Sequence, residues 1–194
     1  MMTSSSFLTL FFILIIFTIK LKVAIAGGAV NDTNGKALDI ASEYSILTPE
    51  INGGGVTVAS NVVKNQLVVV LSIKPLPVNF SDSEGTKVIL TNENIKIEFA
   101  SIPKYNGSSS WIVVNDESAK VWYVAVGSAK NYPNNQIQTG TFKIKPHSFG
   151  YKLFFCSDVS NSFCKEVGIY TDKHGNDRLA LNGTILLIKF QKKL

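Results

Sequence analysis

The side chains best suited to chemistry in this 194-residue chain are its two histidines and its two cysteines. His147 directly precedes Ser148, and His174 stands in a Gly-containing stretch typical of a turn. A serine nucleophile needs a base held against it, and no Gly-x-Ser-x-Gly motif is present to position one. The sequence also has no Gly-rich phosphate loop ending in Lys-Ser or Lys-Thr, and no His/Cys pair at metal-ligand spacing. We therefore predict no catalytic residues, no metal site and no cofactor.

The two cysteines, Cys156 and Cys164, are eight residues apart and are separated by a polar, turn-like stretch. A pair at this separation in a secreted protein is typical of a disulfide that pins a hairpin. The chain-entropy treatment gives so short a loop a stabilisation of roughly 2–3 kcal/mol. A redox role is the alternative, but it needs an exposed, acidic thiol, and no Cys-x-x-Cys motif is present. We expect a structural disulfide.

The first 26 residues have the organisation of a secretory signal peptide. Residues 7–17 form an apolar run that is too short for a membrane span of about 20 residues. Ala24 and Ala26 place small residues at the two positions that a signal peptidase reads. We predict cleavage after Ala26 and a mature chain of residues 27–194, without a membrane segment, that is secreted or reaches the vacuole by the secretory pathway. A retained membrane anchor flanked by Lys20 and Lys22 is the alternative.

Four Asn-x-Ser/Thr sites follow the predicted signal peptide, at Asn31, Asn79, Asn106 and Asn182. This motif is the acceptor for N-linked glycans in secreted proteins. The motif is short and common, so several of the four can go unused. All four stand beside turn-type residues, which fits a secreted glycoprotein.

The composition is that of an ordinary folded domain, with 45% apolar and 17% charged residues. It excludes disorder, collagen-like sequence and coiled coil. The net charge is +5 for the whole chain and +3 once Lys20 and Lys22 leave with the signal peptide. That excess is too small to indicate nucleic-acid binding. We interpret Lys189, Lys192 and Lys193 near the C-terminus as a solvated tail rather than a nucleic-acid arm.

Short β-rich runs recur along residues 27–194, without an amphipathic helix of 12 or more residues between them. Many alternate apolar and charged residues, as in 95–99, which places the apolar set on one face of a strand. Gly- and Asn-rich stretches at 52–55 and 174–177 supply turn residues that tolerate positive φ. Twelve strands at this spacing predict an all-β sandwich or barrel rather than β-α-β units. The expected strands are 44–47, 56–59, 67–72, 87–90, 95–99, 111–114, 121–126, 141–145, 151–156, 168–171, 178–181 and 185–190.

Three blocks of sequence form a pattern that can be compared with known families. The first runs from Val30 through Gly35 to a Tyr-x-aliphatic segment that begins at Tyr44. The second surrounds the cysteines, at 151–156 and 164–169, and the third closes the chain, at 176–181 and 188–192. Together they resemble the plant Kunitz-type (soybean trypsin inhibitor-like) proteins over residues 27–194. The resemblance implies one Kunitz-type domain with the β-trefoil fold: twelve strands in three pseudo-repeats, six of them closing a barrel, with one disulfide.

The resemblance also implies a function, inhibition of an endopeptidase by a substrate-like loop between two early strands. A rigid extended loop fits a protease cleft at little ordering cost. By position the reactive loop is formed by Ser83, Glu84, Gly85, Thr86 and Lys87, and Gly85 is the P1 residue that would enter the S1 pocket. The expected partner is a secreted or extracellular protease of the serine, cysteine or aspartic class. We expect a monomer that is not an enzyme.

The sequence departs from the family pattern in ways that argue against strong inhibition of trypsin. Gly85 has no side chain for an S1 pocket that takes Arg or Lys. Asn65 stands where a cysteine of a further disulfide is expected, and Ile40 replaces an Asn that braces the loop in many inhibitors. A glycan at Asn79 would lie beside the loop. A non-inhibitory binding, storage or defence protein on the same scaffold is the alternative function.

Overall fold

The computed structural model describes residues 27–49, 54–61, 66–82, 85–159 and 164–193. The predicted signal peptide, with its cleavage point after Ala26, lies outside the described residues, as do Asn65, Ser83 and Glu84. The described chain consists of strands and connections, with one short 3-10 turn, η1 (Ala129–Asn131). The predicted all-β class is therefore confirmed.

Fourteen strands run through the described residues, and twelve of them are four or more residues long. The two short strands are β8 (Ile137–Gln138) and β13 (Thr184–Ile185). The twelve longer strands are β1 (Tyr44–Leu47), β2 (Gly55–Asn61), β3 (Gln66–Ser72), β4 (Pro77–Asp82), β5 (Ile95–Phe99), β6 (Trp111–Asp116), β7 (Val121–Val126), β9 (Gly140–His147), β10 (Gly150–Ser157), β11 (Cys164–Thr171), β12 (Asp177–Leu181) and β14 (Lys189–Lys192).

Six of these strands close a barrel. Strand β1 pairs with β4, β4 with β5, β5 with β9, and β9 with β10, all antiparallel. The ring closes through β14, which pairs with β1 and is joined to β10 by the bridge between Tyr151 and Ile188. A closed barrel leaves no strand edge open for pairing with another chain, which is the usual solution to that hazard in all-β proteins.

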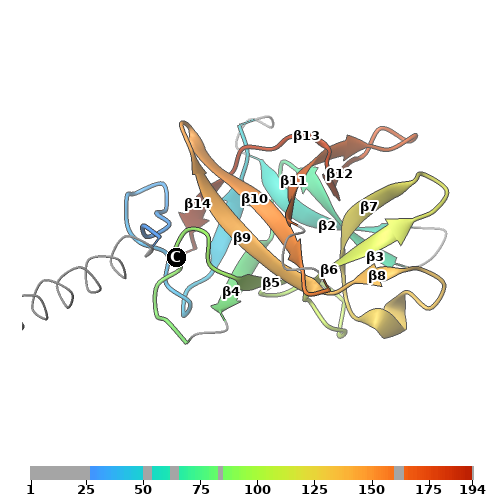
Figure 1. The fold of residues 1–194 in the computed structure, drawn as a ribbon, viewed down its shortest axis with the longest axis horizontal. Helices are drawn as coiled ribbons and strands as arrows, with labels where there is room; N and C mark the ends of the chain where they lie inside the picture. The colour runs from blue at the N-terminus through green and yellow to red at the C-terminus, as the bar shows by residue number, and fades with distance from the viewer. Residues whose placement is uncertain (1–26, 50–53, 62–65, 83–84, 160–163, 194) are drawn as a thin grey trace, which may run out of the picture.

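The other six long strands form three hairpins, β2–β3, β6–β7 and β11–β12. Each hairpin pairs with both of the others, through β3–β7, β7–β12 and β12–β3. Figure 1 shows these hairpins gathered on one side of the molecule, away from the N-terminal segment. The result is three four-strand units arranged about a pseudo-threefold axis, as in a β-trefoil.

The strands form where apolar and polar residues alternate. In β5, Ile95, Ile97 and Phe99 are each 1% exposed, whereas Lys96 and Glu98 between them face solvent. Because successive side chains point to opposite faces of a strand, this pattern assigns one face to the core.

The core contains two series of packed aromatic rings whose neighbouring centroids lie 5.4–6.1 Å apart. Tilted and edge-on contacts of this kind add to the area that the rings bury. One series is Tyr44, Phe80, Phe190 and Tyr151, and the other is Phe99, Trp111, Phe142 and Phe155. The rings come from all three units, so the core ties the three units together.

Most predicted strands are present, but three expectations were wrong. Residues 87–90 form single bridges to the N-terminal segment instead of a strand, and 185–190 is divided between β13 and β14. Strand β4 was missed because prolines and polar residues obscure its alternation. In the structure Pro77 is the first residue of β4, and Val78 and Phe80 are buried. Proline is tolerated at that position because a strand's first residue need not donate to the ladder.

An ion pair closes the turn between β11 and β12. Asp172 Oδ2 lies 2.6 Å from Arg178 Nη2, and Asp172 Oδ1 accepts hydrogen bonds from the backbone N–H groups of His174 and Asn176. Burial raises the pKa of Asp172, but the hydrogen bonds from Asn176 and His174 and the charge of Arg178 outweigh it and bring the pKa from 3.8 to about 2. The folded-state pKa is thus below the unfolded one, so this carboxylate's stabilising contribution is complete above about pH 4 and is lost as the pH falls toward about 2.

Replacing Asp172 with Asn should lower the free energy of unfolding near neutral pH by up to about 2 kcal/mol. The variant should also show a flatter fall in stability between about pH 4 and pH 2, because the group that titrates there is gone. Urea unfolding at several pH values measures both effects. Asp158→Asn, which removes an exposed carboxylate elsewhere, is the control, and an equal pH slope in both variants would contradict the assignment.

Candidate functional site

The segment predicted as the reactive loop leaves β4 and returns to β5, and the structure describes three of its five residues. Gly85 is exposed with a φ of +72°, and a Cβ built on it would meet nothing within 4 Å. Thr86 is half-buried and its hydroxyl donates to the carbonyl of Val88 at 2.9 Å. Lys87 is exposed. Because proteases bind extended backbone, Gly85 must leave its left-handed conformation to occupy a substrate cleft, a change that glycine makes readily.

The base of this loop is held by the N-terminal segment 28–40. Ile89 donates its backbone N–H to the carbonyl of Leu38, and Val30 donates to the carbonyl of Ile89, both at 2.9 Å. The side chains of Val30, Leu38 and Ile89 are fully buried. Thr91 continues the contact by donating to Gly28 at 2.9 Å. The loop is therefore anchored by main-chain hydrogen bonds and an apolar contact.

Ile40 lies at the near end of this contact, next to the predicted reactive residues. Its side chain is half-buried against the core and offers no hydrogen-bonding group, as the sequence indicated. Its backbone N–H, however, donates to the carbonyl of Lys87 at 3.1 Å, and the neighbouring Asp39 bridges to Val88. A main-chain hydrogen bond thus braces the loop at Ile40, the position where the sequence predicts that a bracing side chain is missing.

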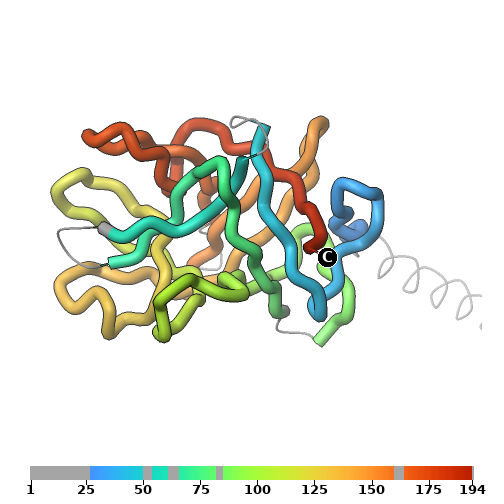
Figure 2. The backbone as a smooth tube through the Cα atoms, turned by 180° about the vertical axis from the view of Figure 1, so that it is seen from behind, coloured from blue at the N-terminus to red at the C-terminus, as the bar shows by residue number. Residues whose placement is uncertain are grey.

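Asp39 fixes the turn that carries Ile40. Its carboxylate accepts hydrogen bonds from Ser42 Oγ at 2.9 Å, Lys192 Nζ at 3.0 Å and the Tyr44 hydroxyl at 3.3 Å. The hydrogen bond from Ser42, with the Lys192 ammonium beside it, lowers the pKa of Asp39 below its usual 3.8. Lys192, predicted to be part of a solvated tail, is exposed, and the structure pairs it with a residue 153 positions earlier. Figure 2 shows the N-terminal segment lying beside this last strand.

Asp39→Ala should loosen the turn and weaken the bond from Ile40 to Lys87. We expect amide hydrogen exchange at Ile40 to accelerate about tenfold, because the variant removes several hydrogen bonds to one carboxylate. Glu43→Ala removes an exposed carboxylate from the same stretch and is the matched control. Unchanged exchange at Ile40 in Asp39→Ala would show that the turn does not depend on this network.

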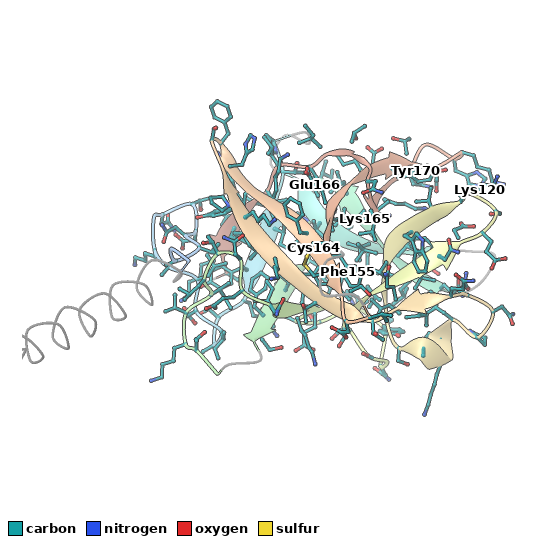
Figure 3. The ribbon with its side chains drawn as sticks, viewed as in Figure 1. Lys120, Phe155, Cys164, Lys165, Glu166 and Tyr170 are labelled. Atoms are coloured by element: carbon teal, nitrogen blue, oxygen red, sulfur yellow. A yellow bond between two sulfur atoms is a disulfide. The ribbon has the colours of Figure 1, made fainter. Side chains whose placement is uncertain are left out.

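The disulfide is formed as predicted, between Cys156 at the end of β10 and Cys164 at the start of β11. The two cysteines face each other in the strand register, as do Phe155 and Lys165 one step away (Figure 3). The bond therefore pins the two strands together at the end of the hairpin where the connection joins them. The connection between the cysteines, residues 160–163, lies outside the described residues.

The four sequons occupy different settings. Asn31 and Asn106 are exposed in connections, and Asn182 is exposed in the turn after β12 with a φ of +59°. Asn79 lies within β4, half-buried and opposite Glu98. Glycosylation at these sites stays a prediction.

The two histidines occupy separate turns, His147 at the end of β9 and His174 between β11 and β12. Within the described ranges, no three His, Cys, Asp or Glu residues are grouped so as to hold a metal ion. The same ranges also contain no helix with the length and apolar character needed to cross a membrane.

Comparison with known proteins agrees with this geometry. The Kunitz legume family model, described as "Trypsin and protease inhibitor", matches residues 30–192. The Kunitz-type trypsin inhibitor-like 2 protein of Pisum sativum is 35% identical over 190 residues, which cover 90% of this chain and 86% of the relative. The subtilisin inhibitor CLSI-II of Canavalia lineata is 33% identical over 165 residues, which cover 78% of this chain and 85% of that protein.

A solved structure supports the fold. The crystal structure of a Kunitz type trypsin inhibitor from Cicer arietinum matches with a TM-score of 0.75 and 29% sequence identity, over 86% of this chain and 99% of that one. The predicted β-trefoil is confirmed by this match together with the threefold pairing of the hairpins. The proteins of the matching family are inhibitors or storage proteins rather than enzymes.

Proposed function

Because this chain belongs to the plant Kunitz-type family of trypsin and protease inhibitors, we propose that it is a secreted inhibitor of endopeptidases whose 83–87 loop enters the protease cleft. Its tight target is a protease other than trypsin. The mature protein begins at Gly27, acts as a monomer and does no chemistry of its own.

The observation that carries the proposal is the anchoring of the loop base. Hydrogen bonds from Ile40, Ile89 and Thr91 join residues 87–91 to the N-terminal segment, and Ile89 is fully buried beneath them. A loop already held on a rigid barrel loses little conformational entropy when a protease binds it. This pre-organisation is what a substrate-like inhibitor needs, and it is achieved without a disulfide in this segment.

The choice of a target other than trypsin rests on Gly85. The S1 pocket of trypsin is selective for a long basic side chain, and Gly85 provides none. Lys87 is exposed but lies two residues further along, beyond the P1 position. The similarity to a subtilisin inhibitor supports a target that does not demand a basic P1 residue.

A titration against a panel of proteases tests this proposal. The panel contains subtilisin, chymotrypsin, trypsin, a papain-like cysteine protease and an aspartic protease. We expect stoichiometric inhibition of at least one enzyme other than trypsin, and loss of that inhibition when the 83–87 loop is replaced by a Gly-Ser segment of equal length. Full activity of every enzyme in the panel would overturn the proposal, whereas inhibition that survives the replacement would move it to another loop.

A binding, storage or defence protein without inhibitory activity is the second candidate function. The observation that favours it is the left-handed φ of Gly85, which is not the extended geometry of a bound substrate. The same panel separates the two functions. The intact mass of the secreted protein tests the predicted secretory route. A mass equal to that of a chain beginning at Gly27 requires cleavage after Ala26.

A further inference from the structure

An open cleft of about 500 Å³ lies between the N-terminal loop and the turn that joins β9 to β10. Its wall on one side contains Asn31 and Thr33, and on the other Ser148, Phe149 and Tyr151, with Lys189 of β14 also on the lining. The volume falls within the range of about 300–1,000 Å³ of sites that take small ligands. Figure 1 shows the β9–β10 hairpin, in orange, projecting from the body of the barrel at this end.

Phe149 is the apolar surface of this cleft. It is 74% exposed, at the tip of a hairpin that buries Ile144, Leu153 and Phe155 in the core. A phenyl ring left in water is a platform for a ligand with both C–H and hydroxyl groups, because the electron-rich face of the ring attracts polarised C–H bonds. Ser148 and Lys189 supply hydrogen-bonding groups on the same lining. An aromatic face ringed by polar groups fits a sugar.

The sequon at 31–33 is held at the edge of the same cleft. Asn31 and Thr33 are exposed, whereas Asp32 between them is only 8% exposed and turns inward. The Asp32 carboxylate accepts hydrogen bonds from the backbone N–H groups of Asn34 at 2.8 Å and Lys36 at 2.9 Å. The Asp32 carboxylate is therefore hydrogen-bonded within the N-terminal loop.

The acceptor residue is also fixed against the hairpin. The backbone N–H of Asn31 donates to the hydroxyl of Tyr151 at 2.8 Å, two residues after Phe149 in the chain. The backbone N–H of Thr33 donates to the carbonyl of Phe190 at 2.8 Å. Anything attached to the Asn31 side chain thus starts at a defined place on the wall of the cleft, with little freedom left in the backbone that carries it.

We propose that Asn31 carries an N-linked oligosaccharide whose first N-acetylhexosamine occupies this cleft against the ring of Phe149. In the transfer, the Asn31 amide nitrogen forms a bond to C1 of the sugar. The bond from C1 to a lipid pyrophosphate donor breaks, the lipid pyrophosphate leaves, and the amide gives up one proton. The attached sugar covers the exposed ring and stabilises the contact between the N-terminal loop and the β9–β10 hairpin. This inference rests on the proposed secretory route and is independent of protease inhibition.

Two of the three remaining sequons, those at Asn79 and Asn182, differ from Asn31 in their surroundings. Asn79 is half-buried within β4, and Asn182 lies in a turn whose Thr184 hydroxyl already donates to the carbonyl of Ile169 at 3.2 Å. Neither residue lines the cleft that contains Phe149. Asn182 therefore provides a control for a glycan that has no aromatic platform in this cleft.

The test is expression of the full chain in a eukaryotic secretory host, followed by peptide mapping and thermal unfolding. We expect a glycan on Asn31, and a Tm about 2–4 °C above that of Asn31→Gln. In Phe149→Ala we expect the Asn31 glycan to remain while the Tm difference between the glycosylated and sugar-free forms disappears. Asn182→Gln should not alter the change in Tm that Phe149→Ala causes, because a sugar on Asn182 does not contact the Phe149 ring.

Three outcomes would overturn the inference. The first is secreted, folded protein with Asn31 unmodified, and the second is failure of the chain to enter the secretory pathway. The third is an equal Tm gain from the sugar with and without the Phe149 ring. A change in a protease inhibition constant on Phe149→Ala in the Asn31→Gln background would assign the ring to a protein contact instead. The panel titration decides the inhibitory function separately, since it needs no sugar.

Discussion

Gly85→Arg should lower the inhibition constant for trypsin by roughly 10–100-fold. A buried anchor residue at the centre of an interface contributes about 2–4 kcal/mol to binding, and an Arg would add such an anchor at the predicted P1 position. Part of the gain is lost, because ordering the long Arg side chain in the pocket costs about 0.5–1.5 kcal/mol. The strain of about 1 kcal/mol that a Cβ brings at a φ of +72° acts on the free loop and is relieved when the backbone becomes extended in the cleft. The space around Gly85 is open, so the side chain itself meets no obstacle. Competitive titration with a chromogenic substrate measures the effect.

Gly85→Ala is the matched control, since it introduces the same backbone strain without a basic group. If Gly85→Arg and Gly85→Ala have the same affinity for trypsin, then position 85 does not enter the S1 pocket. Adding Ile40→Asn should lower the inhibition constant for trypsin by a smaller factor than Gly85→Arg does alone. The main chain of Ile40 already braces the Lys87 carbonyl, and an amide would replace an apolar side chain packed against the core.

Ile89→Ala should lower the free energy of unfolding by about 2–5 kcal/mol, because it leaves a cavity in a fully packed site. Ile89 is 0% exposed and lies between the N-terminal segment and the barrel. Ile89→Ala should also make the 83–87 loop less resistant to proteases, because Ile89 anchors the base of that loop. We expect the variant to be nicked within this loop by proteases that leave the parent protein intact.

Val88→Ala is the control in the same segment. Val88 is only half-buried, so its truncation should cost less than about 1 kcal/mol. Urea unfolding gives the stabilities, and mass mapping after limited proteolysis gives the site of cleavage. Equal losses in the two variants would show that Ile89 is not the anchor of the loop.

The two predictions separate what the loop presents from what holds it. In the proposed mechanism Gly85 determines which protease pocket the loop can fill, and Ile89 determines how firmly the loop is held. A substrate-like inhibitor gains strength from both properties together, because pre-organisation adds affinity only where the presented side chain also fits. In this protein the base of the loop is anchored, and the predicted P1 residue, Gly85, has no side chain. That combination is why we propose a protease target with little requirement at P1.

The local pattern of the sequence was sufficient for the all-β class, most strands and the disulfide. Alternation in segments such as Ile95–Phe99 depends only on neighbouring residues, which determine the face that each side chain occupies. Cys156 and Cys164 are close enough in the chain to be assigned to one hairpin. Strand β4 was missed because local propensity disfavours proline in strands, whereas the actual position of Pro77 at the start of the strand satisfies that restriction.

By itself the sequence determined the β-rich scaffold and the family, because both depend on residue type and short spacing, and it predicts Gly85 as a P1 residue without a basic side chain. Only the tertiary structure decided how the loop is held and what surrounds it. The bond from Ile40 to Lys87, the pairing of Asp39 with Lys192, and the cleft shared by Asn31 and Phe149 each join residues far apart in the chain. Closure of the barrel brings these partners together, and no local pattern of residues encodes which distant segments will meet.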